Sequence, residues 1–249
     1  MTDTTEREPE LLGQTVVLIG GSAGIGLATA RRARAEGADV VLTGRDPGRL
    51  ERAAAEVGAR GTASFDATDA AALGGFFDGL REIVDHVMVT GPGPYYAPLA
   101  DLERERAHRD FDDHLWLAVE VARLSVGRVR PGGTLLFMGG TGGRSRGPGM
   151  SLIGAGTAAL PALVANLAVE VAPIRVNLIA AGFVDTPLSA SLLGGDLDKR
   201  RAELRATLPI GRVVGPADVA ALAVHIMINT ALTGATYDID GGQQLVARG

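Results

Sequence analysis

The chain has 249 residues, a formal net charge of -5 and no cysteine. This length is typical of one α/β domain, and the missing cysteine excludes disulfides, thiolate nucleophiles, iron–sulfur clusters and cysteine-bound zinc. The acidic balance also argues against nucleic acid as the main partner. Lys199 is the only lysine, and the tyrosines are Tyr95, Tyr96 and Tyr237. A mechanism that needs either side chain must therefore use one of these four positions.

Short apolar runs alternate with alanine-rich stretches along the chain. The apolar runs predict strands at residues 15–19, 40–43, 62–65, 87–90, 134–138, 175–179 and 235–239. The stretches between them predict helices at residues 24–36, 50–57, 70–80, 102–127, 151–171 and 216–227. This alternation predicts a single doubly wound Rossmann-type α/β domain over residues 11–249, with a parallel sheet of about seven strands covered by helices on both faces. Residues 184–208 are the least regular and are interpreted as a lid beside a site.

Two segments bear on targeting and on membranes. Residues 1–10 lack an apolar core after their first charges, which predicts a flexible tail and no signal peptide. Residues 147–169 carry no charge and are long enough to raise the question of a membrane span. This stretch contains glycines, Pro161 and Asn166, and it is rich in alanine rather than leucine. These features favour a helix buried against the sheet and a partner subunit. We therefore expect a cytoplasmic protein with no membrane partner.

A glycine-rich turn joins the first predicted strand to the first predicted helix. Its glycines permit a tight turn and let the backbone approach a pyrophosphate, while the helix N-terminus supplies N–H donors and a partial positive charge. The alternative is a plain turn in a glycine-rich chain, but the position within the first βαβ unit favours a dinucleotide site. The candidate cofactor residues in this turn are Gly20, Ser22, Ala23, Gly24, Ile25 and Gly26.

The end of the second predicted strand bears on which dinucleotide is bound. A cofactor with a free 2′-hydroxyl is usually met by a carboxylate at this place, whereas a 2′-phosphate is met by arginine. Gly44 stands where the carboxylate would lie, and Arg45 is the next side chain. This favours NADP(H) over NAD(H), and the alternative is that Arg45 only pairs with Asp46 or with solvent.

Further motifs lie at residues 65–69, 175–187, 211–220 and 240–242. Together with the glycine-rich turn, these segments resemble the short-chain dehydrogenase/reductase family over residues 11–246. The resemblance implies a bound nicotinamide dinucleotide, with an adenine contact from the 65–69 segment and a nicotinamide contact near the end of the 175–187 segment. The further cofactor residues that it implies are Asp66, Ala67, Gly91, Gly182, Val184 and Thr186.

The positions that carry catalysis in that family differ in this chain. Alignment with the family's Tyr-x-x-x-Lys motif puts Ile153 at the tyrosine and Thr157 at the lysine. Gly140 then falls at the catalytic serine, and His114 at the asparagine of the proton relay. In the family the tyrosine transfers the proton of the alcohol. A positioned acid or base typically contributes 10²–10⁴-fold to a rate, so ordinary ketone or alcohol redox is expected to be slow.

Three residues are candidate replacements for these catalytic groups. Tyr95 and Tyr96 follow the fourth predicted strand, at the sheet edge where ligands bind, and aromatic packing over the cleft is the alternative. His114 titrates near neutrality and can serve as an acid, and a plain helix-surface role is the alternative.

Two arginines lie on the loop after the fifth predicted strand. Arg144 and Arg146 can clamp a phosphate or carboxylate of a substrate, and a solvated loop is the alternative. No metal site is expected, because His86, His108 and His225 lack the spacing to carboxylates that a metal needs.

Three functions stay open. The first is an NADP(H)-dependent oxidoreductase with an altered active site, the second a non-catalytic dinucleotide-binding protein, and the third a non-redox enzyme that uses the same cleft. The small-molecule ligand is not readable from the sequence. In the family that this chain resembles, the helix that corresponds to residues 151–171 packs against the same helix of another subunit. The resemblance therefore predicts a homodimer or homotetramer.

Overall fold

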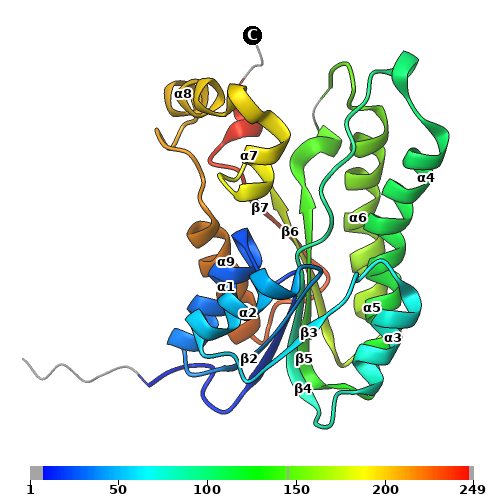
Figure 1. Cartoon of the computed structure of the whole chain (residues 1–249), viewed down its shortest axis with the longest axis vertical. Helices are drawn as coiled ribbons and strands as arrows, with labels where there is room; N and C mark the ends of the chain where they lie inside the picture. The colour runs from blue at the N-terminus through cyan, green and yellow to red at the C-terminus, as the bar shows by residue number, and fades with distance from the viewer. Residues whose placement is uncertain (1–7, 145, 247–249) are drawn as a thin grey trace, which may run out of the picture.

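The fold is built on one parallel sheet of seven strands, in the order β3-β2-β1-β4-β5-β6-β7 (Figure 1). It is known from a computed structural model, which describes residues 8–144 and 146–246. The strands are β1 (Thr15–Ile19), β2 (Asp39–Gly44), β3 (Gly61–Ser64), β4 (Val84–Val89), β5 (Val129–Gly140), β6 (Arg175–Ala181) and β7 (Thr236–Ile239). The strand order reverses between β1 and β4, and ligands of such sheets bind beyond the carboxyl ends at that point. The predicted fold class is confirmed.

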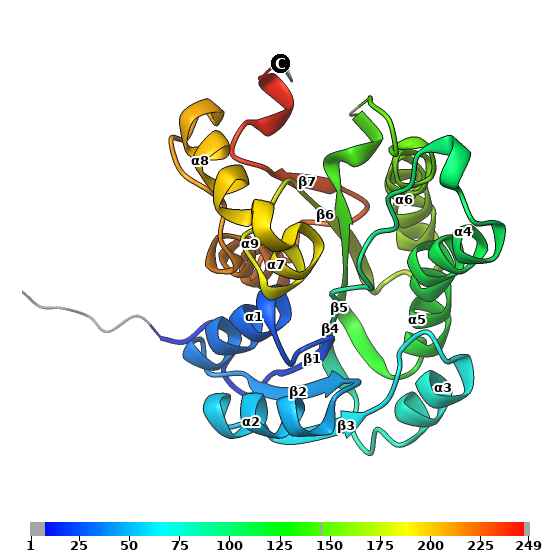
Figure 2. The same cartoon turned by 45° about the horizontal axis from the view of Figure 1, so that its top comes forward.

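Helices cover both faces of the sheet (Figures 1 and 2). The helices on one face are α1 (Gly24–Ala35), α2 (Pro47–Val57) and α9 (Pro216–Ile228). The helices on the other are α3 (Ala70–Asp78), α4 (Arg104–Phe111), α5 (Leu117–Ser125) and α6 (Ser151–Glu170). The remaining two, which stand over the carboxyl ends of the strands at the top of Figure 1, are α7 (Pro187–Leu193) and α8 (Leu197–Thr207).

Alternation along the strands fills two separate cores. In β1, Val16 and Leu18 belong to the core that includes side chains of α1, α2 and α9. Val17 and Ile19 belong to the core that includes side chains of α3, α5 and α6. Successive strand residues point to opposite faces, so a strand covered on both sides requires an uninterrupted apolar run.

Two predicted elements differ from the structure. The helix predicted over residues 102–127 is confirmed as one continuous helical stretch over residues 104–125, but a π-helical turn at Asp112–Trp116 interrupts its regular α-helical repeat between α4 and α5. A π-turn places an extra residue in the helical repeat and so changes which side chains share a face. Residues 184–208, predicted as the least regular stretch, contain α7 and α8 joined by a short 3-10 turn. Their role as a lid stays a prediction.

Helix α6 is long and apolar enough to cross a membrane by length and composition alone. Its inner side is packed into the core through Leu160, Val164 and Leu167, so the predicted packing against the sheet is confirmed. Its outer side exposes small apolar residues, and their partner subunit stays a prediction. Of the predicted tail, residues 1–7 lie outside the described part of the chain, whereas Leu11 is already fully buried.

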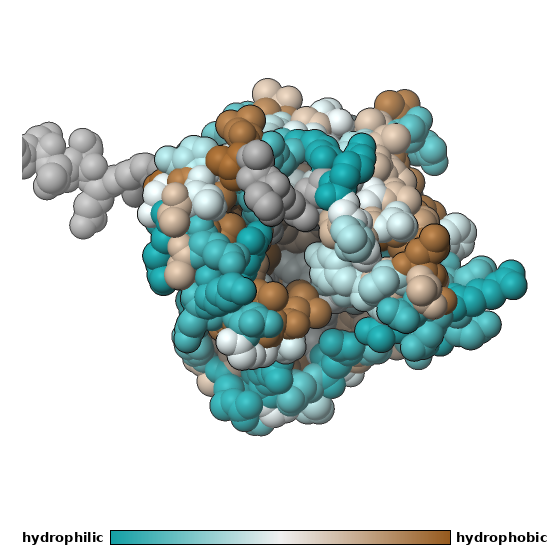
Figure 3. Space-filling model, turned by 90° about the horizontal axis from the view of Figure 1, so that it is seen from above, coloured by the Kyte–Doolittle hydropathy of each residue, from teal (hydrophilic) through white to brown (hydrophobic). Residues whose placement is uncertain are grey.

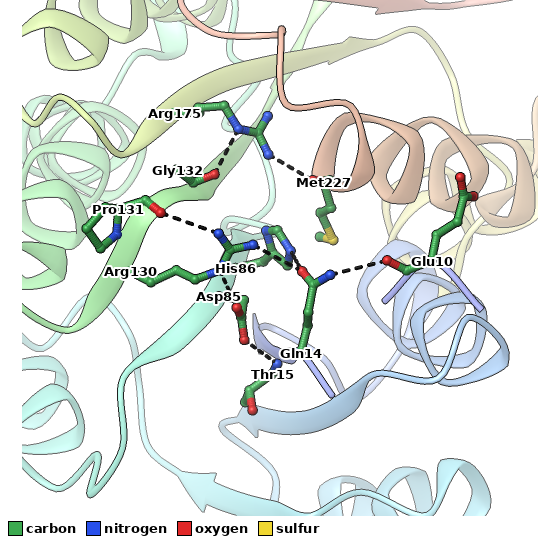
Figure 4. A network of polar contacts seen from close by, with 10 residues as sticks. All are labelled: Glu10, Gln14, Thr15, Asp85, His86, Arg130, Pro131, Gly132, Arg175 and Met227. Carbon is green, nitrogen blue, oxygen red and sulfur yellow. Dashed lines mark hydrogen bonds and ion pairs between the residues drawn. The ribbon is translucent and has the colours of Figure 1, made fainter. Parts of the chain in front are cut away.

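Polar contacts tie together the amino ends of the central strands (Figure 4). The Asp85 carboxylate accepts a hydrogen bond from Thr15 N at 2.7 Å and pairs with Arg130. The Gln14 side-chain oxygen lies 2.8 Å from His86 Nε2 and accepts from Arg130 at 3.3 Å. An amide oxygen only accepts, so His86 Nε2 carries the hydrogen of this bond. His86 Nδ1 then has no hydrogen-bond partner among the described residues.

His86 is expected to make the free energy of unfolding depend on pH. Burial lowers the pKa of His86 from its usual 6.5 to about 3, and the charges of Arg130 and Arg175 act in the same direction. Below about pH 6.5 the unfolded chain binds a proton on this side chain that the folded chain binds only near pH 3. This contribution to stability is therefore complete above pH 6.5 and declines as the pH falls, by up to about 1.4 kcal/mol per pH unit.

Denaturant unfolding at a series of pH values between about 7 and 5 measures this decline. His86→Gln removes the titrating group and is expected to give a shallower decline than the wild type. His225→Gln, which changes an exposed histidine on α9, serves as the control and is expected to keep the wild-type slope. Identical slopes for His86→Gln and the wild type would contradict this expectation.

Candidate functional site

The glycine-rich turn lies at the carboxyl end of β1 and opens α1. A Cβ at Gly26 would lie 2.3 Å from the backbone oxygen of Gly20, and a Cβ at Gly20 would lie 2.4 Å from Thr90 Oγ1. Only glycine therefore allows this close approach of the turn, the helix and β4. Ala23 precedes the first turn of α1 and offers no side-chain acceptor, so the N–H groups of that turn are available to a ligand.

Three neighbouring segments meet beside this turn. A Cβ at Gly44 would lie 3.0 Å from Ser22 Oγ, which places the end of β2 against the turn. Arg45 follows, with its side chain 74% exposed and its guanidinium 3.9 Å from a carboxylate oxygen of Asp66. An exposed ion pair of this length is weak, so it can be exchanged for a phosphate. The structure thus brings together the sequence-predicted residues Ser22, Arg45 and Asp66.

The segment after β6 lies on the other side of the turn. A Cβ at Gly24 would lie 3.6 Å from Thr186 Cβ. Thr186 begins α7, and its hydroxyl accepts a hydrogen bond from Ser189 N at 3.2 Å. A Cβ at Gly182 would lie 2.7 Å from the Gln243 side-chain oxygen, which itself accepts from Phe183 N at 2.8 Å. The residues after β7 therefore hold the loop that leads to Thr186.

A cavity of about 640 Å³ opens beside these segments, and the molecule is visibly hollowed when seen from above (Figure 3). Of the predicted cofactor residues, the cavity is lined by Ile25, Gly91, Gly182, Val184 and Thr186. The others lie along the same sheet edge outside the cavity lining, and they are Gly20, Ser22, Ala23, Gly24, Gly26, Arg45, Asp66 and Ala67. Tyr96 and His114 also line the cavity.

The three positions that the sequence predicts to align with the family's serine, tyrosine and lysine line this cavity. Gly140, at the end of β5, and Ile153 and Thr157, on α6, are among its lining residues. The Thr157 hydroxyl donates to the Ile153 backbone oxygen at 2.7 Å. The ionisable side chains that line the cavity in the described chain are Tyr96, Arg106, Asp110, His114 and Arg200.

The three candidate replacements are placed differently. Tyr95 does not line the cavity: its side chain is buried, its hydroxyl oxygen accepts from Glu103 N at 3.2 Å, and Arg106 lies 4.2 Å from its ring centre. This supports the packing alternative for Tyr95. Tyr96 lies in the cavity lining and is more than half exposed. His114 lies in the π-turn with Nδ1 2.7 Å from the Asp110 backbone oxygen.

The predicted arginine clamp is placed outside the cavity lining. Arg144 donates two hydrogen bonds to the carboxylate of Asp238 in β7, and this contact holds the pKa of Asp238 below its usual value. Arg146 donates to the backbone oxygen of Gly143 at 2.9 Å, and Ser145 lies outside the described residues. Of the two alternatives for Arg144, these contacts favour a structural role over a ligand clamp, because its guanidinium is held by a carboxylate far along the chain. The arginines that line the cavity are Arg106 and Arg200.

Sequence reasoning missed Arg106, Asp110 and Arg200 as cavity residues. Arg106, Asp110 and His114 recur every four residues along the chain. That spacing was the signal, because residues four apart lie on one side of a helix. For metals, the described residues contain no group of three or more metal-ligating side chains.

Comparison with known proteins identifies the family. A family model described as enoyl-(acyl carrier protein) reductase matches residues 20–244. A protein of Stachybotrys chlorohalonatus named short-chain dehydrogenase/reductase ATR9 is 28% identical over 257 residues, covering 94% of this chain and 98% of that protein. The chain belongs to the short-chain dehydrogenase/reductase family. Members of this family bind a nicotinamide dinucleotide.

Solved structures of short-chain dehydrogenase/reductases match nearly the whole chain. MalC Reductase/Diels-Alderase from Malbranchea aurantiaca matches with a TM-score of 0.85 and 25% identity, covering 96% of this chain and 99% of that one. A small-chain dehydrogenase in complex with NADPH matches with a TM-score of 0.79 and 27% identity, covering 93% and 99%. The fold is thus shared along its length with a reductase and with an NADPH-bound dehydrogenase.

Proposed function

We propose that this chain is an NADP(H)-dependent oxidoreductase whose active site differs from the one usual in its family. The observation that carries the proposal is one sheet edge on which Arg45, the glycine-rich turn and the cavity beside Thr186 follow one another. In this order they fit the 2′-phosphate, the pyrophosphate and the nicotinamide of one extended NADPH molecule.

Two features support NADP(H) as the cofactor. The close approach of Gly44 to Ser22 leaves no side chain at the position of a ribose-binding carboxylate. The exposed guanidinium of Arg45 stands beside it, and arginine binds phosphate with charge-assisted, often paired hydrogen bonds. The NADPH complex of a relative that shares this fold agrees with the assignment.

The altered active site limits the chemistry that the cavity supports. Ile153 and Gly140 carry no group that donates or accepts a proton, and the Thr157 hydroxyl bonds to its own helix. Without an acid at these positions, hydride transfer is easiest to a carbon that is already electrophilic, such as that of an iminium ion or a conjugated carbonyl. We therefore propose a reductase of activated C=N, C=C or C=O bonds.

Transfer of deuterium from labelled NADPH tests this function. The chain is incubated with N-methyl-3,4-dihydroisoquinolinium and NADPH carrying deuterium on one or the other face of C4, and the amine product is analysed by mass spectrometry. We expect label in the product from one of the two forms only, because the protein holds one face of the nicotinamide toward the substrate. Tight NADPH binding with no transfer would contradict the proposal and favour a non-catalytic dinucleotide-binding protein.

We also propose that the chain forms a homodimer or homotetramer through α6. The outer side of this helix exposes Ala155, Ala158, Ala159 and Ala162, and Val169 is 77% exposed. Small residues let two helices approach closely, and an apolar stripe of this kind is stabilised by burial. Light scattering is expected to give at least twice the mass of one chain, and a monomer would contradict the proposal.

A further inference from the structure

One stripe of α4 and the π-turn carries ionisable side chains into the cavity. Arg106, Asp110 and His114 follow one another at intervals of four residues, and all three line the cavity. His114 belongs to the π-turn at Asp112–Trp116, and α6, which carries Ile153 and Thr157, packs against this turn. The stripe thus faces the same cavity as the positions aligned with the family's tyrosine and lysine.

The hydrogen bonds of His114 define which ring nitrogen serves the cavity. Nδ1 lies 2.7 Å from the backbone oxygen of Asp110 and 3.5 Å from its carboxylate oxygen Oδ1. A backbone oxygen only accepts, so Nδ1 carries a hydrogen and donates it. Nε2 is then the ring nitrogen left for a ligand, as an acceptor in the neutral ring and as a donor in the protonated ring. The His114 side chain is only 15% exposed, so its orientation is held by packing.

Asp110 is fixed in place beside the imidazole. Its Oδ1 accepts a hydrogen bond from Tyr95 N at 3.0 Å, and its side chain is 9% exposed. Tyr95 lies in the loop that follows β4. Its hydrogen bond to Asp110 therefore links this loop, at the carboxyl edge of the sheet, to the end of α4 next to the π-turn. A carboxylate at Nδ1 holds an imidazole in one tautomer and stabilises its protonated form.

Other charges also surround His114. Asp112 and Asp113 flank it on the π-turn, and burial raises the pKa of Asp113. Arg106 on α4 and Arg200 on α8 line the same cavity, and Asp66 acts on Asp113 from the loop after β3. Helix α6 has no charged side chain before Glu170. The Asp110 carboxylate is therefore close to His114, while Arg106 on the same stripe and Arg200 on α8 line the same cavity.

We propose that His114 donates the proton that completes carbonyl reduction in this cavity, with Asp110 as its positioning residue. The proposal rests on the proposed reductase function. Bound NADPH would supply the hydride that adds to the carbonyl carbon and would be oxidised to NADP⁺, and the electrons of the C=O π bond would move to oxygen. The oxygen takes the proton from Nε2 of protonated His114 and leaves as an alcohol. Neutral His114 then regains a proton from water, so the donor is restored after each turnover.

Two probes of similar size separate the proton step from hydride transfer. 1-Tetralone is a neutral ketone whose oxygen must gain a proton, whereas N-methyl-3,4-dihydroisoquinolinium becomes a neutral amine by hydride transfer alone. His114→Gln is expected to lower the ratio of ketone to iminium kcat by about 100-fold, within the range for one acid. His108→Gln, which changes an exposed histidine on α4, serves as the matched control and should leave both rates unchanged.

The pH profile gives the second measurement. Wild-type ketone reduction should fall as the pH rises and His114 loses its proton, while iminium reduction should not show this fall. The fall should be absent in His114→Gln. Asp110→Asn keeps an acceptor for Tyr95 N but removes the charge beside His114 Nδ1, so ketone reduction should drop by about tenfold relative to iminium reduction.

Each alternative outcome of these experiments contradicts a different part of the proposal. Equal losses with both probes in His114→Gln would make His114 structural. A full ketone rate in His114→Gln, with the loss appearing in Tyr96→Phe instead, would assign the proton to Tyr96. If the wild type reduces the iminium ion but not the ketone, the proposed reductase function is supported and the proposed role of His114 as the acid is contradicted. Reduction of neither probe would overturn both the proposed function and this proposal.

Discussion

Replacing Arg45 with alanine is expected to weaken NADPH binding by about 10- to 100-fold and to leave NADH binding within about twofold. The Arg45 guanidinium follows the end of β2. It is exposed, and it lies 3.9 Å from a carboxylate oxygen of Asp66. On NADPH binding it would exchange this weak exposed pair for charge-assisted bonds to the 2′-phosphate, each stabilising the complex by about 1.5–3 kcal/mol. NADH has no phosphate there, so the substitution removes no bond from it. Fluorescence titration of both cofactors measures the two affinities.

Arg60→Ala is the matched control for this prediction. Arg60 also carries an exposed guanidinium beside a carboxylate, in its case that of Glu82. It precedes β3 and so lies at the opposite, amino edge of the sheet. Its loss should change neither affinity. Equal weakening of NADPH and NADH by Arg45→Ala would remove Arg45 as the residue that selects the phosphate.

Replacing Gly26 with alanine is expected to disrupt both the turn and cofactor binding. The added Cβ would lie 2.3 Å from the backbone oxygen of Gly20, a distance at which the backbone itself must move. Overpacking of this kind costs about 1–3 kcal/mol, which lowers Tm by roughly 2–10 °C for a chain of this length. The moved turn no longer aims its N–H groups at the pyrophosphate, so NADPH binding should weaken by at least about tenfold.

Gly74→Ala provides the comparison for the same chemical change. Gly74 lies in α3 with no atom within 4 Å of an added Cβ. Alanine there should raise stability slightly, since glycine costs up to about 1 kcal/mol inside a helix, and NADPH binding should be unaffected. Thermal unfolding and NADPH titration of the two variants supply both readouts. Wild-type Tm and NADPH affinity in Gly26→Ala would show that the turn is not as tight as its geometry indicates.

The sheet could be predicted from the sequence because its signal is local. The strand predicted at residues 15–19 coincides with β1, and the apolar residues of that strand fill both cores. The glycine-rich turn was predictable for the same reason, because the number and spacing of its glycines indicate a tight backbone turn. Arg45 was predicted from the end of a strand and Asp66 from the family resemblance, and parallel pairing of β2 with β3 brings the two residues to one edge.

The parts that escaped prediction depend on contacts through space. The role of Arg144 stayed open between a ligand clamp and a solvated loop, because its carboxylate partner, Asp238, lies 94 residues along the chain. Asp110 was not predicted as a site residue, because its burial depends on Tyr95 and on the cavity rather than on its neighbours in sequence. The long helix was predictable, but the π-turn within it that carries His114 has no clear signature in residue type.

The most direct test of the central claim is a fluorescence titration of the wild-type chain with NADPH and, separately, with NADH. If the glycine-rich turn and Arg45 form a working cofactor site, NADPH binds in the micromolar range and NADH at least about tenfold more weakly. Binding of neither cofactor would contradict the claim, because the turn would then have no dinucleotide to hold. Equal binding of both would retain the dinucleotide site and overturn the assignment of NADP(H).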